Sequence, residues 1–423
     1  MKVVEFLTPQ RDSHIIVPDY TKNFFIKNKY KILPKNIYLK RLIVFLNLKF
    51  FRKIKAIITL LLKCSIKFQD PIKRENIIFD RECSEIIEEI LRKSDYMVLP
   101  TRINHFKEIF ISKKILYLFF KNFFKRSLKI NYLACLIEIM GPKKIITAID
   151  TSVDFFKISK IFRKKGVKTI AIQISHKGAD YIPYSFDAEE YFTLGEFEKF
   201  ELKKHVKNTK KIKSIGSLRA VLAKDFLLKK NIPLKKEFDI CLFAETNLVI
   251  NKDGYQKTKN PEEFIARVAE FTIKFCAKHN KKMIFTGKAL EDDYKKELEI
   301  LFYKKHLKSD KFKLDFNKTR EMGTYKNIAL SDLTIGFNTT ASRESFAFKT
   351  KTLWCSFSGS PDVKIPGVGI HILKSNTYED FEQRVLNLLE LSYEEYLTKI
   401  ENLDHIYNTK IDTIKFLKQE ICN

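Results

Sequence analysis

The stretch from Ser331 to Phe348, SDLTIGFNTTASRESFAF, combines residue types that could bind a phosphate. Its apolar, partly β-branched start predicts a buried strand, and small polar residues then lead into a helical pattern. Such a turn directs backbone N–H groups and the positive end of a helix dipole at one spot. We therefore predict a nucleotide site made by Gly336, Asn338, Thr339, Thr340 and Glu344, with Glu344 accepting from ribose hydroxyls. An ordinary strand–helix connection is the alternative, since no GxGxxG or Walker sequence is present.

Lys288 is a further candidate for this nucleotide site. It follows a strand expected over residues 282–286 and could reach a phosphate from the neighbouring strand of the same sheet. The alternative is a solvated lysine, because lysine is abundant throughout the chain.

Three residues of the first half, Asp150, His176 and Glu196, each come just after an expected strand. A parallel sheet gathers the carboxyl ends of its strands at one edge, so these catalytic candidates could share a cleft. Asp150 or His176 could remove a proton from an acceptor hydroxyl, or Asp150 could act as a nucleophile. The alternatives are a helix N-cap for Asp150 and a structural, hydrogen-bonded role for His176.

The seven cysteines are widely spaced, odd in number and form no CxxC pair, which argues against a zinc knuckle and a disulfide framework. We expect a reducing compartment and no catalytic metal or other cofactor. The N-terminus lacks the unbroken apolar core of a signal peptide. The most apolar early run, Leu42 to Cys64, is interrupted by Lys49 and Arg52, so no membrane span is expected. These features predict a cytoplasmic protein.

The formal net charge is +28, from 79 Lys and Arg against 51 Asp and Glu. Nucleic acid, an anionic membrane or anionic small substrates could be the partner, and compositional bias of a genome could account for part of the excess. A basic helix expected over 36–68 could lie on an anionic leaflet or pack as an amphipathic helix of the core. The aromatic run Leu116–Phe124, inside a helical region expected over 105–140, could be core, membrane-facing or partner-facing.

From Pro142 onward, helices alternate with strands, among them strands expected over 144–149, 169–173, 238–244 and 330–337, which predicts parallel sheets of an α/β protein. A basic, proline-containing linker over 224–236 separates two such series. The expected organisation is a Rossmann-like domain over 1–223 with a basic helical insertion, a second Rossmann-like domain over 237–385, and C-terminal helices over 386–423.

Several phrases in the order of the chain resemble those of known enzymes. Ser331-Asp332, Gly336-Phe337, Thr339-Thr340 and Glu344 resemble the nucleotide-binding domain of GT-B glycosyltransferases. The first half looks like bacterial surface-carbohydrate biosynthesis proteins of the capsule and lipopolysaccharide type. The matching phrases are Ile149-Asp-Thr-Ser152, Thr169-Ile-Ala-Ile-Gln173, Phe192-Thr-Leu-Gly-Glu196 and Ile215-Gly-Ser-Leu-Arg219. One departure is Gln173-Ile-Ser-His-Lys-Gly178, where relatives tend to have Gln-His-Gly or Gln-Asn-Gly.

This resemblance implies a GT-B-like fold, with two Rossmann-like domains whose parallel sheets face across a cleft. It implies a metal-independent, peripheral-membrane glycosyltransferase. The C-terminal domain would bind a nucleotide-sugar donor, including a CMP-linked, Kdo-like one, and the N-terminal domain an anionic or lipid-linked glycan acceptor at the inner face of the plasma membrane. The layout also resembles polyol-phosphate transferases of the teichoic-acid type, which use a CDP-alditol. A basic nucleic-acid-binding protein is a third alternative, although no RRM, KH, zinc-finger or HTH phrase is present.

Overall fold

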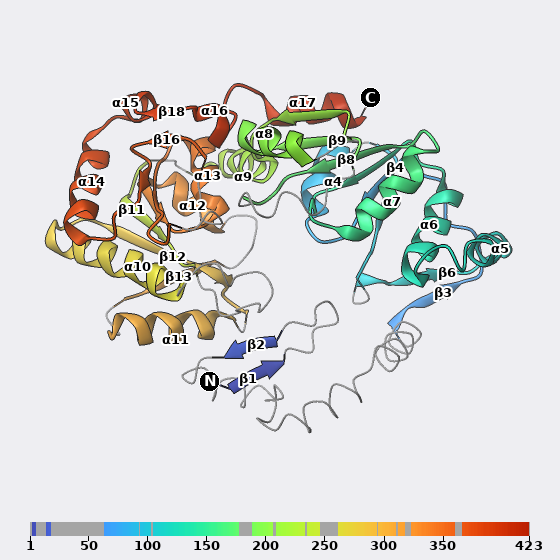
Figure 1. Ribbon diagram of the computed structural model, residues 1–423, viewed down its shortest axis with the longest axis horizontal. Coiled ribbons are helices and arrows are strands. Elements are labelled where there is room, and N and C mark those ends of the chain that lie inside the picture. Colours follow the sequence, from blue (N-terminus) through green and yellow to red (C-terminus); the bar gives the residue numbers. More distant parts are fainter. Residues whose placement is uncertain are drawn as a thin grey trace. The chain divides into compact units, whose positions relative to one another are not determined.

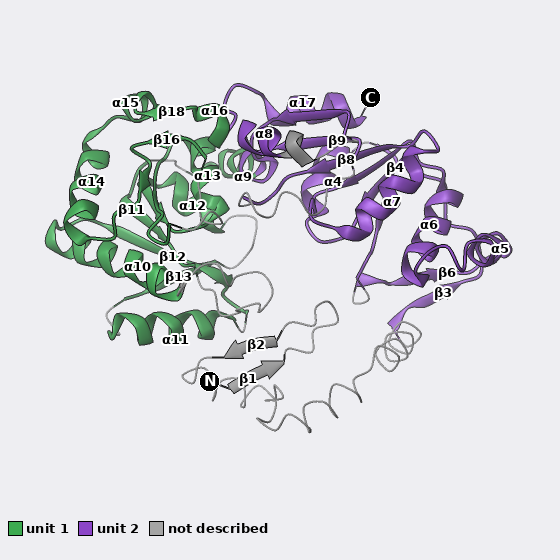
Figure 2. Ribbon diagram, viewed as in Figure 1, with its two compact units in different colours: residues 1–48, 223–406 green, residues 49–222, 407–423 purple. Residues whose placement is uncertain are grey.

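The computed structural model describes side chains in residues 63–92, 94–102, 105–176, 188–201, 209–232, 235–245, 262–293, 295–309, 312–317, 323–359 and 366–422. It also describes the backbone of 2–5, 14–17, 202–205 and 261, where β1 (Lys2–Glu5) pairs antiparallel with β2 (His14–Val17). The chain divides into two compact units (Figure 2): unit 1 comprises residues 1–48 and 223–406, and unit 2 comprises 49–222 and 407–423. Residues 407–423 thus belong with the earlier half of the sequence.

Unit 2 contains a six-stranded, fully parallel sheet in the order β10-β9-β8-β7-β4-β5 (Figure 1). Its strands are β4 (Asn76–Phe79), β5 (Tyr96–Leu99), β7 (Lys144–Thr147), β8 (Lys168–Ile172), β9 (Glu190–Thr193) and β10 (Lys211–Ser214). The strand order reverses between β4 and β7, because the chain first adds β5 on one side of β4 and then builds outward from the other side. The carboxyl ends of β4 and β7 therefore form the switch point where ligands bind in such sheets.

Helices cover both faces of this sheet, as a parallel sheet requires. They are α4 (Glu85–Leu91), α5 (Lys113–Lys121), α6 (Leu128–Met140), α7 (Val153–Arg163), α8 (Glu196–His205), α9 (Leu218–Lys229), which extends into unit 1, and α17 (Thr413–Cys422). Successive strand residues point to opposite faces. Ile77 packs with residues of α6 and α7, whereas Ile78 packs with residues of α4 and α17.

Unit 1 contains a second six-stranded, fully parallel sheet, in the order β13-β12-β11-β14-β15-β17. Its strands are β11 (Phe238–Phe243), β12 (Met283–Leu290), β13 (Leu314–Asn317), β14 (Ser331–Gly336), β15 (Lys351–Cys355) and β17 (Ile372–Leu373). This is the order of a Rossmann sheet, and its switch point lies between β11 and β14.

The helical elements of unit 1 are α10 (Pro261–Lys278), α11 (Lys295–Leu307), α12 (Gly323–Ala329), α13 (Thr340–Glu344), the 3₁₀ helix η4 (Ser345–Phe348), α14 (Tyr378–Glu390), α15 (Tyr393–Thr398) and α16 (Leu403–Ile406). A two-stranded antiparallel ladder joins β16 (Val368–Gly369) to β18 (Ile400–Glu401). None of the helices in the described ranges is both long and apolar enough to cross a bilayer.

The predicted strands at 144–149, 169–173, 238–244 and 330–337 are confirmed, with ends that differ by one or two residues. The predicted helical region over 105–140 is wrong at its start. Residues Glu108–Phe110 form β6, which pairs in parallel with β3 (Ser65–Lys67), so that a distant strand overrides the helical pattern. The same pairing makes the end of the predicted basic helix a strand, and residues 36–62 of that helix lie outside the described residues.

Candidate functional site

At the switch point of unit 1, the side chain of Glu245 bridges the ends of β11 and β14. Its carboxylate accepts hydrogen bonds from the backbone N–H groups of Phe337, at 2.5 Å, and Asn338, at 2.6 Å. Gly336 permits this approach, because an added Cβ there would lie 3.0 Å from Glu245 Oε1 and 2.9 Å from Ser342 Oγ. The turn predicted to receive a phosphate thus already holds two carboxylate oxygens.

Burial raises the pKa of the Glu245 carboxyl to about 7, although the two backbone hydrogen bonds and the charge of Lys288 act in the opposite direction. Burial dominates because it penalises the charged form. The backbone N–H of Glu245 donates to the Tyr303 hydroxyl at 3.0 Å, which fixes the start of this segment against α11. The carboxyl therefore changes its charge near neutral pH while it sits on the N–H groups of the turn. Sequence inspection missed Glu245, although an acidic residue just after a buried strand is the signal that selected Asp150.

The predicted nucleotide residues of the 336–344 stretch follow one another around this turn. Thr339 caps α13, because its hydroxyl accepts from the Ala341 N–H at 3.3 Å, and Thr340 is the first residue of the helix. Glu344 lies at the end of α13, is buried, and accepts a hydrogen bond from the Tyr325 hydroxyl at 3.0 Å. That Glu344 also accepts from a ribose stays a prediction.

Lys288 lies inside β12, near its carboxyl end, with its side chain exposed. The expected strand end at residue 286 is wrong, and β12 is not the neighbour of β14, because β11 lies between them. The β12–β13 register shifts between Thr286 and Leu290, and the Lys288 and Ala289 N–H groups donate to the Glu299 carboxylate at 2.9 and 3.0 Å. Burial raises the pKa of Glu299 to about 7 as well. The positive charge of Lys288 acts to lower the pKa of both Glu245 and Glu299, against the larger effect of burial.

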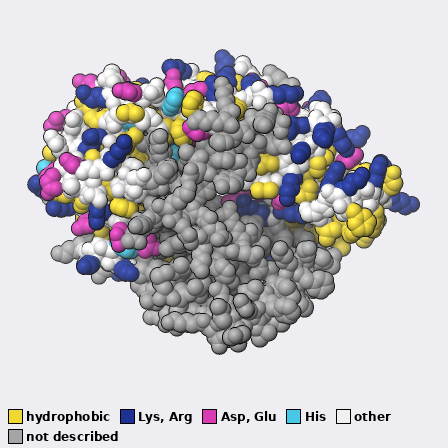
Figure 3. Space-filling model, viewed as in Figure 1, with side chains coloured by type: hydrophobic (Ala, Val, Ile, Leu, Met, Phe, Trp, Pro, Cys, Tyr) yellow, Lys and Arg dark blue, Asp and Glu magenta, His cyan; other side chains and the backbone are white. Residues whose placement is uncertain are grey.

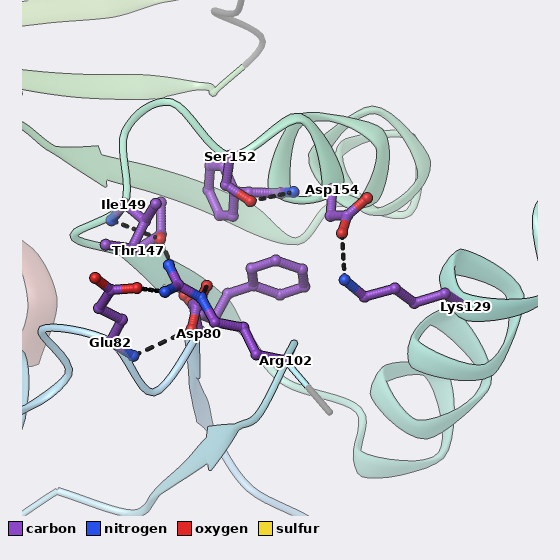
Figure 4. A network of polar contacts seen from close by, with 10 residues as sticks. Asp80, Glu82, Arg102, Lys129, Thr147, Ile149, Ser152 and Asp154 are labelled. Atoms are coloured by element: carbon purple, nitrogen blue, oxygen red, sulfur yellow. Dashed lines mark hydrogen bonds and ion pairs between the residues drawn. The ribbon is translucent and has the colours of Figure 1, made fainter. Parts of the chain in front are cut away.

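The switch point of unit 2 carries a charged network that sequence inspection missed (Figure 4). Asp80, directly after β4, is buried in a left-handed conformation with φ of 81°. Arg102, which follows β5, forms ion pairs with Asp80 at 3.4 Å and with Glu82. The two acids are also linked to each other, because the Glu82 N–H donates to Asp80 Oδ1 at 3.1 Å. Asp80 and Glu82 follow β4, and Arg102 follows β5. Charged residues just after strands are the pattern that could have identified all three.

Asp150, the first predicted catalytic residue, follows β7 at the same switch point. It is buried, and its Oδ2 accepts a hydrogen bond from the Tyr191 hydroxyl of β9 at 2.5 Å. The alternative that Asp150 caps the next helix is wrong, because Ser152 is the N-cap of α7 and accepts from the Phe155 N–H at 3.2 Å. The buried carboxylate is thus held by a side chain two strands away.

His176 and Glu196 follow β8 and β9, so that the three predicted catalytic residues lie at the carboxyl ends of three adjacent strands. His176 is partly buried. Glu196 begins α8, accepts from the Ser214 hydroxyl and forms an ion pair with Lys199 at 2.6 Å. Its bonds support the sheet edge, and a catalytic role for either residue stays a prediction. No group of three His, Cys, Asp or Glu side chains in the described ranges is placed to hold a metal ion.

Comparison with solved structures supports the architecture. A putative UDP-N-acetylglucosamine 2-epimerase from Listeria monocytogenes superimposes with a TM-score of 0.50 at 11% identity, over 82% of this chain and 95% of that chain. The chain has a GT-B-like fold. Its two parallel six-stranded sheets confirm the predicted pair of Rossmann-like domains.

Two further solved structures are similar at lower scores. The UDP-GlcNAc 2-epimerase of Methanocaldococcus jannaschii, in complex with UDP-GlcNAc and UDP, has a TM-score of 0.48 at 12% identity, over 83% of this chain and 100% of that chain. A variant of the wall teichoic acid polymerase TagF has a TM-score of 0.48 at 9% identity, over 83% of this chain and 89% of that chain. No protein-family model matches the chain, and no curated protein matches it in sequence.

Proposed function

We propose that this protein is a glycosyltransferase that moves a sugar from a nucleotide-sugar donor to a surface-polysaccharide or lipid-linked acceptor, with CMP-linked, Kdo-like donors among the candidates. The observation that carries the proposal is the turn after β14, where two backbone N–H groups bind the oxygens of Glu245 beside Gly336. This turn lies at the switch point of a Rossmann sheet, where such sheets bind nucleotides.

On the donor side, the phosphate of the nucleotide accepts hydrogen bonds from the backbone N–H groups of Phe337 and Asn338, in place of Glu245. A phosphate presents the same paired oxygens as the carboxylate that sits there, and Glu245 releases the turn most easily when it is protonated, near or below its pKa of about 7. Lys288 supplies a positive charge from β12, which β11 separates from β14, and Thr339 and Thr340 supply hydroxyl donors. Glu344 would accept from the ribose.

On the acceptor side, Asp150 acts as the general base, with its Oδ2 oriented by the Tyr191 hydroxyl. It takes the proton of the acceptor hydroxyl while the acceptor oxygen bonds to the anomeric carbon of the sugar. The bond from that carbon to the phosphate oxygen breaks, and the nucleotide leaves with its electron pair. Backbone N–H groups and Lys288 stabilise the negative charge that develops on the phosphate, and no metal is needed for this step. His176 is the alternative base.

Product analysis tests this assignment and separates it from the polyol-phosphate alternative. The full-length protein would be incubated with nucleotide sugars and with a CDP-alditol, and the released nucleotides separated. A glycosyltransferase releases the nucleotide of one nucleotide sugar by slow transfer to water, whereas a polyol-phosphate transferase releases CMP from the CDP-alditol.

Variants then test the assigned residues. Lys288→Ala should lower the release about tenfold, and Lys326→Ala, an exposed lysine of the same unit, should leave it unchanged. Full activity in an Asp150→Ala, Glu344→Ala double variant would contradict the site assignment.

A further inference from the structure

Helix α5 of unit 2 presents an apolar face that the unit leaves uncovered. Ile115 is the one residue of this helix that is fully buried. The exposed fractions of Tyr117, Phe120 and Phe124 are 65%, 66% and 97%. Leu116, Phe123 and Leu128 are also exposed. Figure 3 shows hydrophobic side chains gathered where Figure 1 places α5. We call these six residues the α5 patch; single exposed apolar residues are ordinary, but a contiguous group marks an interaction surface.

The three phenylalanine rings of this patch form one cluster. Phe120 and Phe123 lie 6.4 Å apart between ring centroids, and Phe123 and Phe124 lie 5.2 Å apart. Residues three apart lie on one side of a helix, which places Tyr117 and Phe120 together on α5, and Phe124 follows in the turn after the helix. The cluster is thus a continuous surface.

The backbone beneath the patch is firmly held. The Ser112 hydroxyl caps α5 by accepting from the Ile115 N–H at 3.1 Å. At the other end, the Asn131 side chain, fully buried in α6, donates to the Phe119 carbonyl at 2.7 Å. Phe119 and Leu118 pack against the core of the unit. The rings are therefore displayed by an ordered helix, so their exposure is a property of the folded unit.

Positive charges surround the patch. Residues 113–129 contain six Lys and Arg and no Asp or Glu: Lys113, Lys114, Lys121, Lys125, Arg126 and Lys129. Lys114 forms an ion pair with Asp70, and Lys129 with Asp154. The other four cations make no ion pair with a described residue. An open hollow of about 480 Å³ beside α5 is lined by Lys113, Lys114, Tyr117 and one acid, Glu138, which pairs with Lys165.

We propose that the α5 patch docks on an anionic lipid bilayer, with Phe120 and Phe124 at the boundary of the acyl chains and Lys121, Lys125 and Arg126 at the lipid phosphates. Amphipathic helices with aromatic residues on one side and Lys or Arg at the edges bind membranes in this way. A second copy of the chain fits less well. A two-fold contact through the same patch would bring like cations together, whereas lipid phosphates complement them.

A fluorescence experiment tests the insertion directly. The chain has one tryptophan, Trp354, which is fully buried and gives a constant background. Phe124→Trp in the full-length protein should shift its emission to shorter wavelength on vesicles of phosphatidylcholine with about 30% phosphatidylglycerol, and brominated lipids should quench it. The matched control is Phe200→Trp, because Phe200 is 58% exposed on α8, away from the patch. It should show neither effect.

Co-sedimentation with the same vesicles tests the contributions of the rings and of the cations. Phe120→Ala with Phe124→Ala should reduce binding at least tenfold. Lys121→Glu with Lys125→Glu should reduce it at least about 25-fold, at about fivefold per lysine removed, whereas Lys164→Glu with Lys418→Glu makes the same charge change elsewhere on the surface and should reduce it far less. Raising the salt from about 0.1 M to about 0.5 M should release the wild type.

Three outcomes would overturn the proposal: no binding of the wild type, equal binding of the Phe120→Ala, Phe124→Ala variant, or a wild-type dimer that this variant turns into a monomer. The last would assign the face to a second copy of the chain. Docking on lipid does not depend on the nucleotide site, so nucleotide binding by the same variants reports separately on the proposed transferase.

Discussion

The two switch points of this protein hold their carboxylates in different ways. In unit 1, Glu245 rests on the backbone N–H groups of Phe337 and Asn338. In unit 2, Asp80 is paired with the guanidinium of Arg102, which also contacts Glu82. The donors of the unit 1 turn are backbone N–H groups, which bind a carboxylate and a phosphate alike. At the unit 2 edge, the Arg102 guanidinium is already shared by two acids.

This difference supports opposite roles for the two edges. The unit 1 turn offers N–H donors, and Lys288 lies on β12, two strands away from β14 in the same sheet, which favours the phosphates of a nucleotide. The unit 2 edge gathers the carboxylates of Asp80 and Asp150, which repel phosphates but can take a proton from a hydroxyl. The division of labour between donor and acceptor is a proposal that rests on this contrast, and the following experiments would break or sharpen it.

The largest effect is expected from Asp150→Asn. Losing the base should lower glycosyl transfer by about 10²–10⁴-fold. Nucleotide binding should stay within about twofold of wild type, because the substitution lies in the other unit. Asp154→Asn is the matched control, since Asp154 is a nearby, partly exposed acid that pairs with Lys129. Transfer at the wild-type rate in a folded Asp150→Asn protein would remove Asp150 from the mechanism.

Gly336→Ala should weaken nucleotide binding about tenfold to a hundredfold. The new methyl group would lie 2.9 to 3.0 Å from Ser342 Oγ, Glu245 Oε1 and the Thr339 Cγ2 atom, and overpacking of this kind costs about 1–3 kcal/mol. Isothermal titration of the nucleotide measures the loss. Ala148→Gly, which changes a buried methyl at the end of β7 in unit 2, should leave the affinity unchanged. Equal losses in both variants would show that the two edges do not differ as described.

Glu245→Gln tests the titration of the unit 1 carboxyl. Its folded pKa of about 7 lies above its ordinary value of 4.5, so its contribution to stability is fully present below pH 4.5 and is lost as the pH rises through about 7. The free energy of unfolding of the wild type should therefore fall between about pH 5 and pH 8. In the variant, the free energy of unfolding should fall by roughly 2 kcal/mol less over this pH range. The fall that remains comes from Glu299, whose pKa is also raised to about 7. Denaturant unfolding at several pH values measures this difference. If the variant and the wild type show the same dependence of the unfolding free energy on pH, Glu245 does not change its charge near pH 7.

The smallest effect is expected from Arg102→Ala in unit 2. It removes the cation from buried Asp80 and should cost about 1–2 kcal/mol of stability, because Arg102 is itself partly exposed. Arg74→Ala breaks the exposed pair with Asp95 and should cost less than about 0.5 kcal/mol. Thermal unfolding of both variants provides the comparison. If Arg102→Ala and Arg74→Ala lose the same stability, the Asp80–Arg102 pair stabilises the fold no more than an exposed ion pair does.

The sequence allowed the strands, the polar turn after β14 and the catalytic candidates after β7, β8 and β9 to be predicted, because strand patterns and parallel-sheet edges follow from local residue types. It did not predict partners that only the fold brings together. Glu245 and Phe337 are 92 positions apart, and they meet because β11 and β14 are neighbours in the sheet. The bond from Tyr191 to Asp150 spans 41 positions. Strand order decides these contacts, and no local pattern encodes it.

The most direct test of the central claim is the thermal stability of the protein with CMP, CDP, UDP, GDP and dTDP. A ligand of the native state raises the melting temperature by mass action. One nucleotide should stabilise the wild type selectively, with a smaller shift in Lys288→Ala and an unchanged shift in Lys326→Ala. CMP would indicate a Kdo-like donor, and CDP in preference to CMP a polyol-phosphate transferase. No shift with any nucleotide, together with tight and salt-sensitive binding to RNA, would contradict a nucleotide site at the unit 1 switch point.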